Sequence, residues 1–297
     1  MGVSRTVAAT GVRAIFGYGY AGASQNITNL VSNTGVVAAD VTGVGTARYG
    51  ISAAGYGSDK AIFGYGKATA ASSLTNLVSN IGVVAADVTG VGTARNELAA
   101  ARYSTDKAIF GYGLNAAFGV VSMTNLVSNI GVVAADVTGV GTARTGLAAA
   151  RYSTDKAIFG YGAVSAVYTS VTNLVSNAGV VAADVTGVGT TRAYLAAANY
   201  GTDKAIFGYG TNGAVVSMTN LVSNTGVVAT NTTGVGTQRQ TLAAAGYSTD
   251  KAIFGYGLIS TTAQSMTNLV SNIGVVATDT TGVGTARYGL AASSYGS

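Results

Sequence analysis

The chain has 297 residues, of which 43 are Gly, and it contains no Pro, Cys, His or Trp. The absence of His and Cys excludes Ser-His-Asp and Cys-His catalysis, disulfides and the usual zinc, copper and haem ligand sets. We therefore expect neither a metal nor a cofactor. Hydrophobic residues make up 48% of the chain and charged residues only 9%, a composition too apolar for a disordered protein.

The chain carries 16 Lys and Arg against 11 Asp and Glu, which gives a net charge of +5. These charges are spread singly, without the basic stripe that nucleic-acid-binding proteins carry, so no nucleic-acid partner is expected. Residues 1–19 lack the apolar core of a secretory signal. No stretch of about 18 apolar residues is free of interruption, so we also expect no membrane insertion.

An internal repeat dominates the sequence and is interpreted before any local pattern. Its best-preserved segment, AIFGYG, recurs at intervals of 47 to 49 residues. The six copies start at Ala14, Ala61, Ala108, Ala157, Ala205 and Ala252. TNLVSN also occurs six times, and each unit closes on GVGT followed by two residues, the second of which is Arg. The chain is therefore a tandem array of six units.

Taken in chain order, one unit has the pattern of four short strands joined by turns. Val, Ile, Thr, Tyr and Phe favour strands, and no segment combines helical length with a 3.6-residue period. In the second full unit the predicted strands are residues 98–103, 107–113, 124–128 and 132–138. The tight turn before the last strand ends at Gly131, where a positive φ is expected. The predicted fold class is all-β.

Four strands in a unit of this length are typical of a β-propeller blade. An open solenoid, the alternative, would need polar capping repeats at its ends, and the sequence shows none. Residues 287–297 instead supply a first strand with no second strand after it. We therefore predict a single domain over residues 1–297, a six-bladed β-propeller of four-stranded antiparallel blades that is monomeric in isolation. The ring is closed by strand 287–297 against residues 14–19, or by residues 2–9, which resemble the same strand.

The propeller prediction assigns a place to the small and large apolar residues of each unit. The run Leu-Ala-Ala-Ala, as at residues 98–101, suits the innermost strand, where blades converge and space is least. The Phe of each AIFGYG segment, such as Phe110, would fill the wider space between blades.

The units resemble kelch repeats. Arg144 precedes the small-residue strand at residues 147–150, and the next strand, residues 156–162, ends in Gly-Tyr-Gly, where kelch repeats have an Arg, a small-residue inner strand and a Gly doublet. The later Tyr and Trp of kelch repeats are missing. The AIFGYG and TNLVSN segments are also similar to repetitive proteins of tailed phages, which implies a virion or adhesin context.

The six units differ mainly at two places. One is a loop of eight to ten residues between the second and third strands, at residues 20–27, 67–74, 114–123, 163–171, 211–218 and 258–266. The other is the pair after each repeat Arg, at residues 49–50, 96–97, 145–146, 193–194, 240–241 and 288–289. We call these the variable loops and the variable pairs. Up-and-down strand order predicts that both lie on the same face of the ring.

Loops on a rigid scaffold commonly carry binding residues, and Tyr, Asn and Ser make adaptable contacts at low entropic cost. The candidate ligand-binding residues are Tyr20, Tyr49, Asn96, Glu97, Asn115, Phe118, Tyr168, Tyr194, Gln240 and Tyr288. The other interpretation stays open: exposed loops also diverge when nothing depends on them.

The repeat arginines form a second candidate site. They are Arg48, Arg95, Arg144, Arg192, Arg239 and Arg287. Converging at the channel mouth, six guanidinium groups would hold an anion or a carboxylated glycan. In the alternative, which we favour, each Arg is paired structurally, for instance with Asp40, Asp87, Asp136, Asp184 or Asp279.

The sequence thus predicts a non-enzymatic recognition module that binds a protein or a surface glycan through its variable face. The alternative is an architectural or engineered repeat scaffold without a ligand. An enzyme is disfavoured because no unit shows the facing pair of carboxylates that glycosidase chemistry needs.

Overall fold

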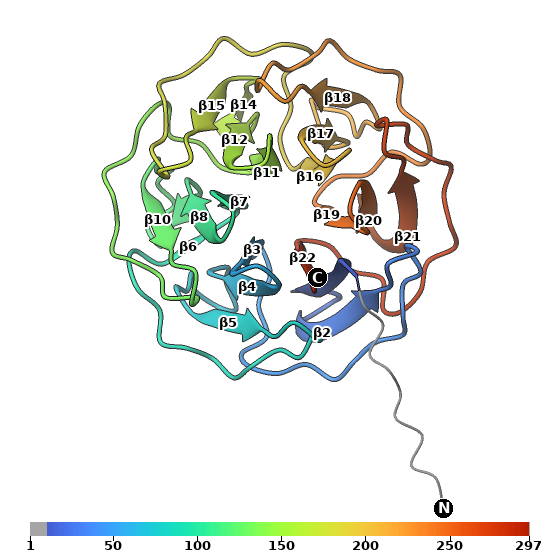
Figure 1. The fold of residues 1–297 in the computed structure, drawn as a ribbon, viewed down its shortest axis with the longest axis horizontal. Coiled ribbons are helices and arrows are strands. Elements are labelled where there is room, and N and C mark those ends of the chain that lie inside the picture. The colour runs from blue at the N-terminus through green and yellow to red at the C-terminus, as the bar shows by residue number, and fades with distance from the viewer. Residues whose placement is uncertain (1–10, 297) are drawn as a thin grey trace, which may run out of the picture.

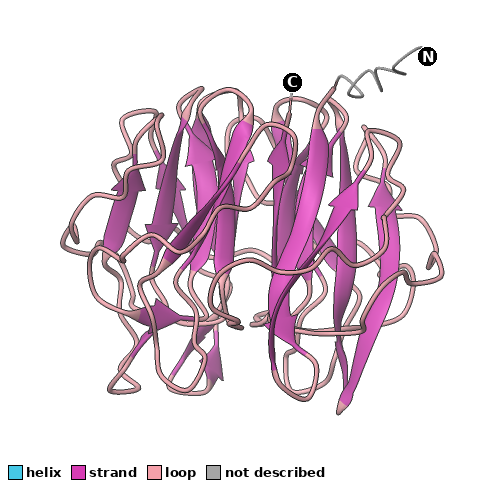
Figure 2. Cartoon of the chain, turned by 90° about the horizontal axis from the view of Figure 1, so that it is seen from below, coloured by secondary structure: helices cyan, strands magenta, loops and turns pink. Residues whose placement is uncertain are grey.

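The structure, a computed structural model, describes residues 11–296 as strands joined by turns and loops. Six three-stranded and two two-stranded sheets are present in this part of the chain, and every strand pair is antiparallel. The three-stranded sheets stand in a ring around a central axis (Figure 1), with their strands running between the two faces of the ring (Figure 2). The all-β prediction is confirmed. Within residues 11–296 there is no helix long and apolar enough to cross a membrane.

Each three-stranded sheet has an inner strand near the axis, a middle strand that contains AIFG, and an outer strand that contains TNLV. In that order, the first sheet contains β22 (Ala291–Tyr295), β1 (Arg13–Tyr20) and β2 (Ser24–Val31), and the second contains β3 (Ser52–Tyr56), β4 (Lys60–Gly64) and β5 (Thr75–Val78). The third contains β7 (Ala99–Tyr103), β8 (Lys107–Gly111) and β10 (Thr124–Val127), and the fourth contains β11 (Ala148–Tyr152), β12 (Lys156–Gly160) and β15 (Thr172–Val175). The fifth contains β16 (Ala196–Tyr200), β17 (Lys204–Gly208) and β18 (Thr219–Val222), and the sixth contains β19 (Ala243–Tyr247), β20 (Lys251–Ile259) and β21 (Thr262–Val270). The two small sheets pair β6 (Arg95–Asn96) with β9 (Leu114–Asn115), and β13 (Ala163–Val164) with β14 (Val167–Tyr168).

The predicted four-stranded sheets are wrong in one respect, because the fourth segment of each unit is not a regular strand. In the unit of β10 this segment makes only two isolated bridges, Val133 to Val127 and Val137 to Thr124. The outer segment carries one more residue than β10 between these bridges, which is the disruption a β-bulge produces. The Asn125 amide fills the break by donating to Ala134 O at 3.0 Å. A side chain here replaces ladder bonds of the main chain.

The first and last described segments meet in one sheet. β22 pairs with β1 from Arg13–Tyr295 to Gly17–Ala291, so the end of the chain supplies the inner strand of the sheet that the beginning of the chain starts (Figure 1). The predicted pairing of the C-terminal segment with residues 14–19 is confirmed. The alternative closing segment, residues 2–9, lies outside the described residues.

The apolar cores lie between neighbouring sheets. Phe63 of β4 is fully buried and packs with Tyr18 of the preceding sheet, their ring centroids 5.1 Å apart. Gly17 of that same sheet allows the close approach, because a Cβ there would stand 2.7 Å from Phe63 Cζ. The predicted place of the Phe residues between units is confirmed, and the Ala-rich strands lie nearest the axis (Figure 1).

Main-chain hydrogen bonds link the six inner strands in a circle at the variable face. The second residue of each variable pair donates its N–H to the carbonyl of the corresponding residue in the preceding unit, at 2.7 to 3.0 Å. All six have φ between 51° and 62°. They are Gly50, Glu97, Gly146, Tyr194, Thr241 and Gly289. We call this circle the main-chain ring.

The close packing of each Phe ring against a Gly of the preceding sheet, which we call the interlock, yields a first prediction. Gly64→Ala puts a Cβ 2.7 Å from Phe110 Cζ of the next sheet, and overpacking of this kind costs about 1–3 kcal/mol. Gly55→Ala in the same sheet is the matched control, since its Cβ meets nothing closer than 3.6 Å. Urea unfolding should show Gly64→Ala destabilised and Gly55→Ala unchanged or slightly stabilised. Equal effects of the two substitutions would refute the interlock.

Candidate functional site

The variable loops and the variable pairs lie side by side, as predicted. In all six cases the first residue of a pair forms an antiparallel bridge or strand pair with the first residue of the next unit's loop. The partners are Tyr49 and Lys67, Asn96 and Leu114, Thr145 and Ala163, Ala193 and Thr211, Gln240 and Leu258, and Tyr288 and Tyr20. Side chains that differ between units are therefore gathered around one opening of the ring.

Three tyrosines from two neighbouring sheets form a cluster beside this opening: Tyr20 ends β1 and Tyr288 precedes β22 in one sheet, and Tyr49 precedes β3 of the next. The ring of Tyr20 lies 5.1 Å from that of Tyr49 and 5.5 Å from that of Tyr288. Lys67 Nζ lies 5.0 Å above the Tyr49 ring, a cation–π contact. All three rings remain partly exposed. The cluster presents a fixed aromatic surface with one cation at its edge.

Phe118 stands at the tip of the longest variable loop and is 80% exposed. Its φ is 60°, which a bulky residue rarely adopts. The loop is held by Asn115, whose Oδ1 accepts hydrogen bonds from the N–H groups of Ala117 and Gly119, while its carbonyl accepts from Phe118 N. A large apolar side chain is thus displayed to solvent on a fixed loop.

The opening itself is polar on one side. Glu97 accepts hydrogen bonds through Oε2 from the hydroxyls of Thr145 at 3.1 Å and Tyr194 at 3.3 Å. Burial, with the nearby Glu97 charge, raises the pKa of Tyr194 to about 12. The main-chain ring and the Leu or Ile residues behind it enclose a shallow cavity of about 80 Å³.

The remaining candidate residues of the variable loops and pairs are Tyr168, Gln240 and Asn96. Tyr168 lies in β14 and pairs with Ala163 across the small hairpin, and Gln240 bridges Leu258 and is partly exposed. Asn96 is only 3% exposed. Its amide nitrogen has no hydrogen-bond partner within the described part of the chain, so Asn96 is not placed to contact a ligand.

The six repeat arginines do not reach a channel mouth, and the anion-site hypothesis for them is wrong. Each is 0% exposed. Arg144 donates through Nε to Tyr161 O at 2.8 Å, through Nη2 to Asn173 Oδ1 at 2.6 Å and through Nη1 to Thr142 O at 3.0 Å. Its guanidinium also stacks 4.5 Å from the Tyr112 ring of the preceding sheet. The structural interpretation of these arginines is confirmed.

The carboxylate partner of each Arg belongs to the following unit. Arg48 lies 3.4 Å from Asp87, which also accepts hydrogen bonds from Thr46 N at 2.9 Å and Thr46 Oγ1 at 2.6 Å. The last contact of this kind joins Arg287 to Asp40 at 3.9 Å, which closes the circle. One unit has Asn231 in place of Asp, and it bonds Thr190 by its amide instead. We call the set of Tyr, Thr, Arg, Asn and Asp contacts at each boundary the arginine junction.

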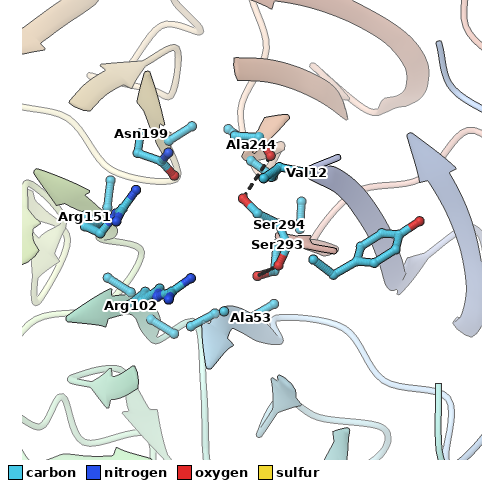
Figure 3. Close-up of a pocket in the computed structure, with 18 of the residues that line it drawn as sticks. Val12, Ala53, Arg102, Arg151, Asn199, Ala244, Ser293 and Ser294 are labelled. Carbon is cyan, nitrogen blue, oxygen red and sulfur yellow. Dashed lines mark hydrogen bonds between the residues drawn. The ribbon is translucent and has the colours of Figure 1, made fainter. Parts of the chain in front are cut away.

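A third variable position was missed by the sequence analysis. It is the residue before the inner-strand Tyr, and it lines the channel at the face opposite the variable loops. The six units have Gly55, Arg102, Arg151, Asn199, Gly246 and Ser294 there. Arg102, Arg151 and Asn199 border the same cavity, of about 140 Å³ (Figure 3). Aligning the six units at this column would have revealed it, because Gly, Arg, Asn and Ser all occur there in an otherwise uniform strand.

Comparison with protein-family models and with curated proteins returns no match for this chain. What the molecule does must therefore be argued from its own residues.

The arginine junction gives the second prediction. Arg144→Lys keeps the charge but cannot satisfy Tyr161 O and Asn173 Oδ1 together from the same position. Buried acceptors left without donors cost about 1–3 kcal/mol each, so we expect a loss of about 2–4 kcal/mol in the free energy of unfolding. Lys156→Met in an exposed ion pair is the control and should change it by less than about 0.5 kcal/mol. Similar values for both variants would contradict the junction's role.

The third prediction concerns pH. Partial burial raises the pKa of Asp87, but hydrogen bonds from Thr46 and Asn76 outweigh it and lower the pKa overall. The resulting stabilisation is complete above about pH 4, the ordinary Asp value, and is lost as pH falls through the folded pKa. Burial raises the pKa of Tyr65 to about 12. This stabilisation is complete below about pH 10 and is lost as pH rises further.

Because the chain contains no His, we expect the free energy of unfolding to be flat between about pH 5 and pH 9. Urea titrations across this range measure it. A step in stability near neutral pH would show that other groups control the fold.

Proposed function

We propose that the ring is a six-bladed, kelch-like β-propeller that acts as a non-enzymatic recognition module in a virion or adhesin. It binds a surface glycan or a protein on the face of the variable loops and pairs. The single observation that carries this proposal is the display of fixed aromatic side chains at variable positions. These are the cluster of Tyr20, Tyr49 and Tyr288 and the exposed Phe118.

Two physical arguments support binding at this face. Tyr offers a large contact area at low conformational cost, and the Tyr20 contacts have already removed rotational freedom from these rings. An 80% exposed Phe held in a left-handed backbone conformation is unfavourable for an isolated domain. A partner that covers Phe118 would gain the burial of an aromatic ring already held in place.

The second candidate function is a scaffold without a ligand. It is favoured by the near-identity of the junctions, because the guanidinium of every repeat Arg bonds the Asn of the following unit at 2.5 to 2.7 Å. A ring of this regularity would be stable whatever its loops carry.

The fourth prediction separates the two functions. The test variant combines Tyr20→Thr, Tyr49→Thr and Tyr288→Thr, since Thr211 and Thr145 occupy the equivalent positions in other units, with Phe118→Asn, which tolerates a positive φ. Glycan arrays and pull-downs from host-surface extracts should show ligands of the wild type bound at least tenfold more weakly, about 1.4 kcal/mol, by this variant.

The matched control is Lys107→Gln with Lys156→Gln on the opposite face, where both side chains are exposed; it should bind like the wild type. Equal binding by the wild type and by the variant with all four substitutions would contradict the proposal that the variable face binds the ligand. Absence of any ligand, with stability unchanged when all six loops are replaced by the loop of residues 67–74, would establish the scaffold function.

A further inference from the structure

We propose that the channel cavity opposite the variable face binds a small oxyanion, a phosphate or carboxylate group, between Arg102 and Arg151. These residues occupy equivalent positions on the neighbouring inner strands β7 and β11 and border the cavity together (Figure 3). The site is separate from the variable face and does not depend on the proposed function.

Among the residues that the structure describes, Arg102 has no counter-ion in direct contact. No carboxylate of residues 11–296 lies within ion-pair distance of it. Its Nε is buried and has no hydrogen-bond partner in the same part of the chain. A buried N–H without an acceptor costs about 1–3 kcal/mol, so the free protein keeps an unsatisfied donor beside a cavity.

The acidic residues nearest to this pair are already engaged. Asp106 lies 3.9 Å from Lys107 and Asp155 lies 4.0 Å from Lys156, while Asp59 lies 3.0 Å from Lys60. Each turn is therefore close to neutral, and the two guanidinium groups supply the excess positive charge of the cavity.

The charge of Arg151 also acts on Arg102. Burial lowers the pKa of Arg102, and the charge of Arg151 lowers it further. Arg151 donates one hydrogen bond, from Nη1 to Thr154 O at 3.2 Å, which leaves other donors of its guanidinium for a ligand. Like charges held together by a fold are stabilised by an anion between them.

The chemistry of the lining selects the ligand. Guanidinium groups bind carboxylate and phosphate oxygens through paired N–H donors, and the Asn199 amide borders the same cavity (Figure 3). The remaining wall is mostly Ala and Gly and also includes Asp59 and Lys60, which pair with each other at 3.0 Å. It leaves about 140 Å³ free. Since a water needs only about 10–15 Å³ on this scale, a small anion fits together with several waters.

The test uses the whole chain and inorganic phosphate as the probe. The variant Arg102→Ser with Arg151→Ser introduces the residue that Ser294 already places at this position in β22, so folding is preserved. Lys107→Gln with Lys156→Gln also removes two positive charges but leaves the cavity intact. Calorimetry and phosphorus NMR should give the wild type and the Lys variant a Kd of about 1 mM or below. The Ser variant should bind at least tenfold more weakly.

A parallel titration with acetate identifies the oxyanion. Tighter binding of acetate assigns the site to carboxylates, and tighter binding of phosphate assigns it to phosphates. Thermal unfolding supplies a second measurement: phosphate should raise the Tm of the wild type but not that of the Ser variant, and without phosphate the Ser variant should have the higher Tm. The proposal is overturned if neither anion saturates the wild type, or if the Lys variant loses as much affinity as the Ser variant.

Discussion

The arginine junction is the contact on which the rest of the structure depends. A guanidinium buried without partners is strongly destabilising, so each repeat Arg must find its acceptors on the following sheet. Arg287 finds them at Tyr18 O and Asn29, near the other end of the chain. The circle is therefore closed by the same polar contacts as its other boundaries, in addition to the strand pairing of β22 with β1. If the acceptors of one junction were removed, its Arg would remain in the core as a buried charge without partners.

The period and alternation of the sequence were enough to predict the inner, middle and outer strands and the Gly turns. For the closing segment they left two alternatives, of which the C-terminal one pairs with β1. The break in the predicted fourth strand could not be foreseen, because Val132 and its neighbours have strand composition and the break comes from the Asn125 side chain. The burial of the repeat arginines could not be predicted from composition either, because an Arg beside a loop is usually exposed. Only the spatial coincidence of Tyr161 O, Asn173 and Tyr112 explains its burial.

The sequence predicted the exposed positions of the candidate residues only in part, for physical reasons. Variation between units located the Tyr cluster and Phe118, since side chains outside the core are free to differ. The same variation misled at Asn96, which is buried. Arg102 and Arg151 escaped notice because they lie at the end of the predicted inner strands, outside the variable loops and the variable pairs. The narrow axis of the ring instead turns that strand position into the wall of a cavity.

The main-chain ring has a consequence for how such a protein diversifies. Its six hydrogen bonds run from backbone to backbone, so the width of the opening is set without any side chain. Gly, Glu, Tyr and Thr all occupy it at nearly the same φ. Each residue other than Gly carries a cost of order 1 kcal/mol for that conformation, which closure of the circle offsets. New chemistry can accumulate at this rim one unit at a time, while its shape stays constant.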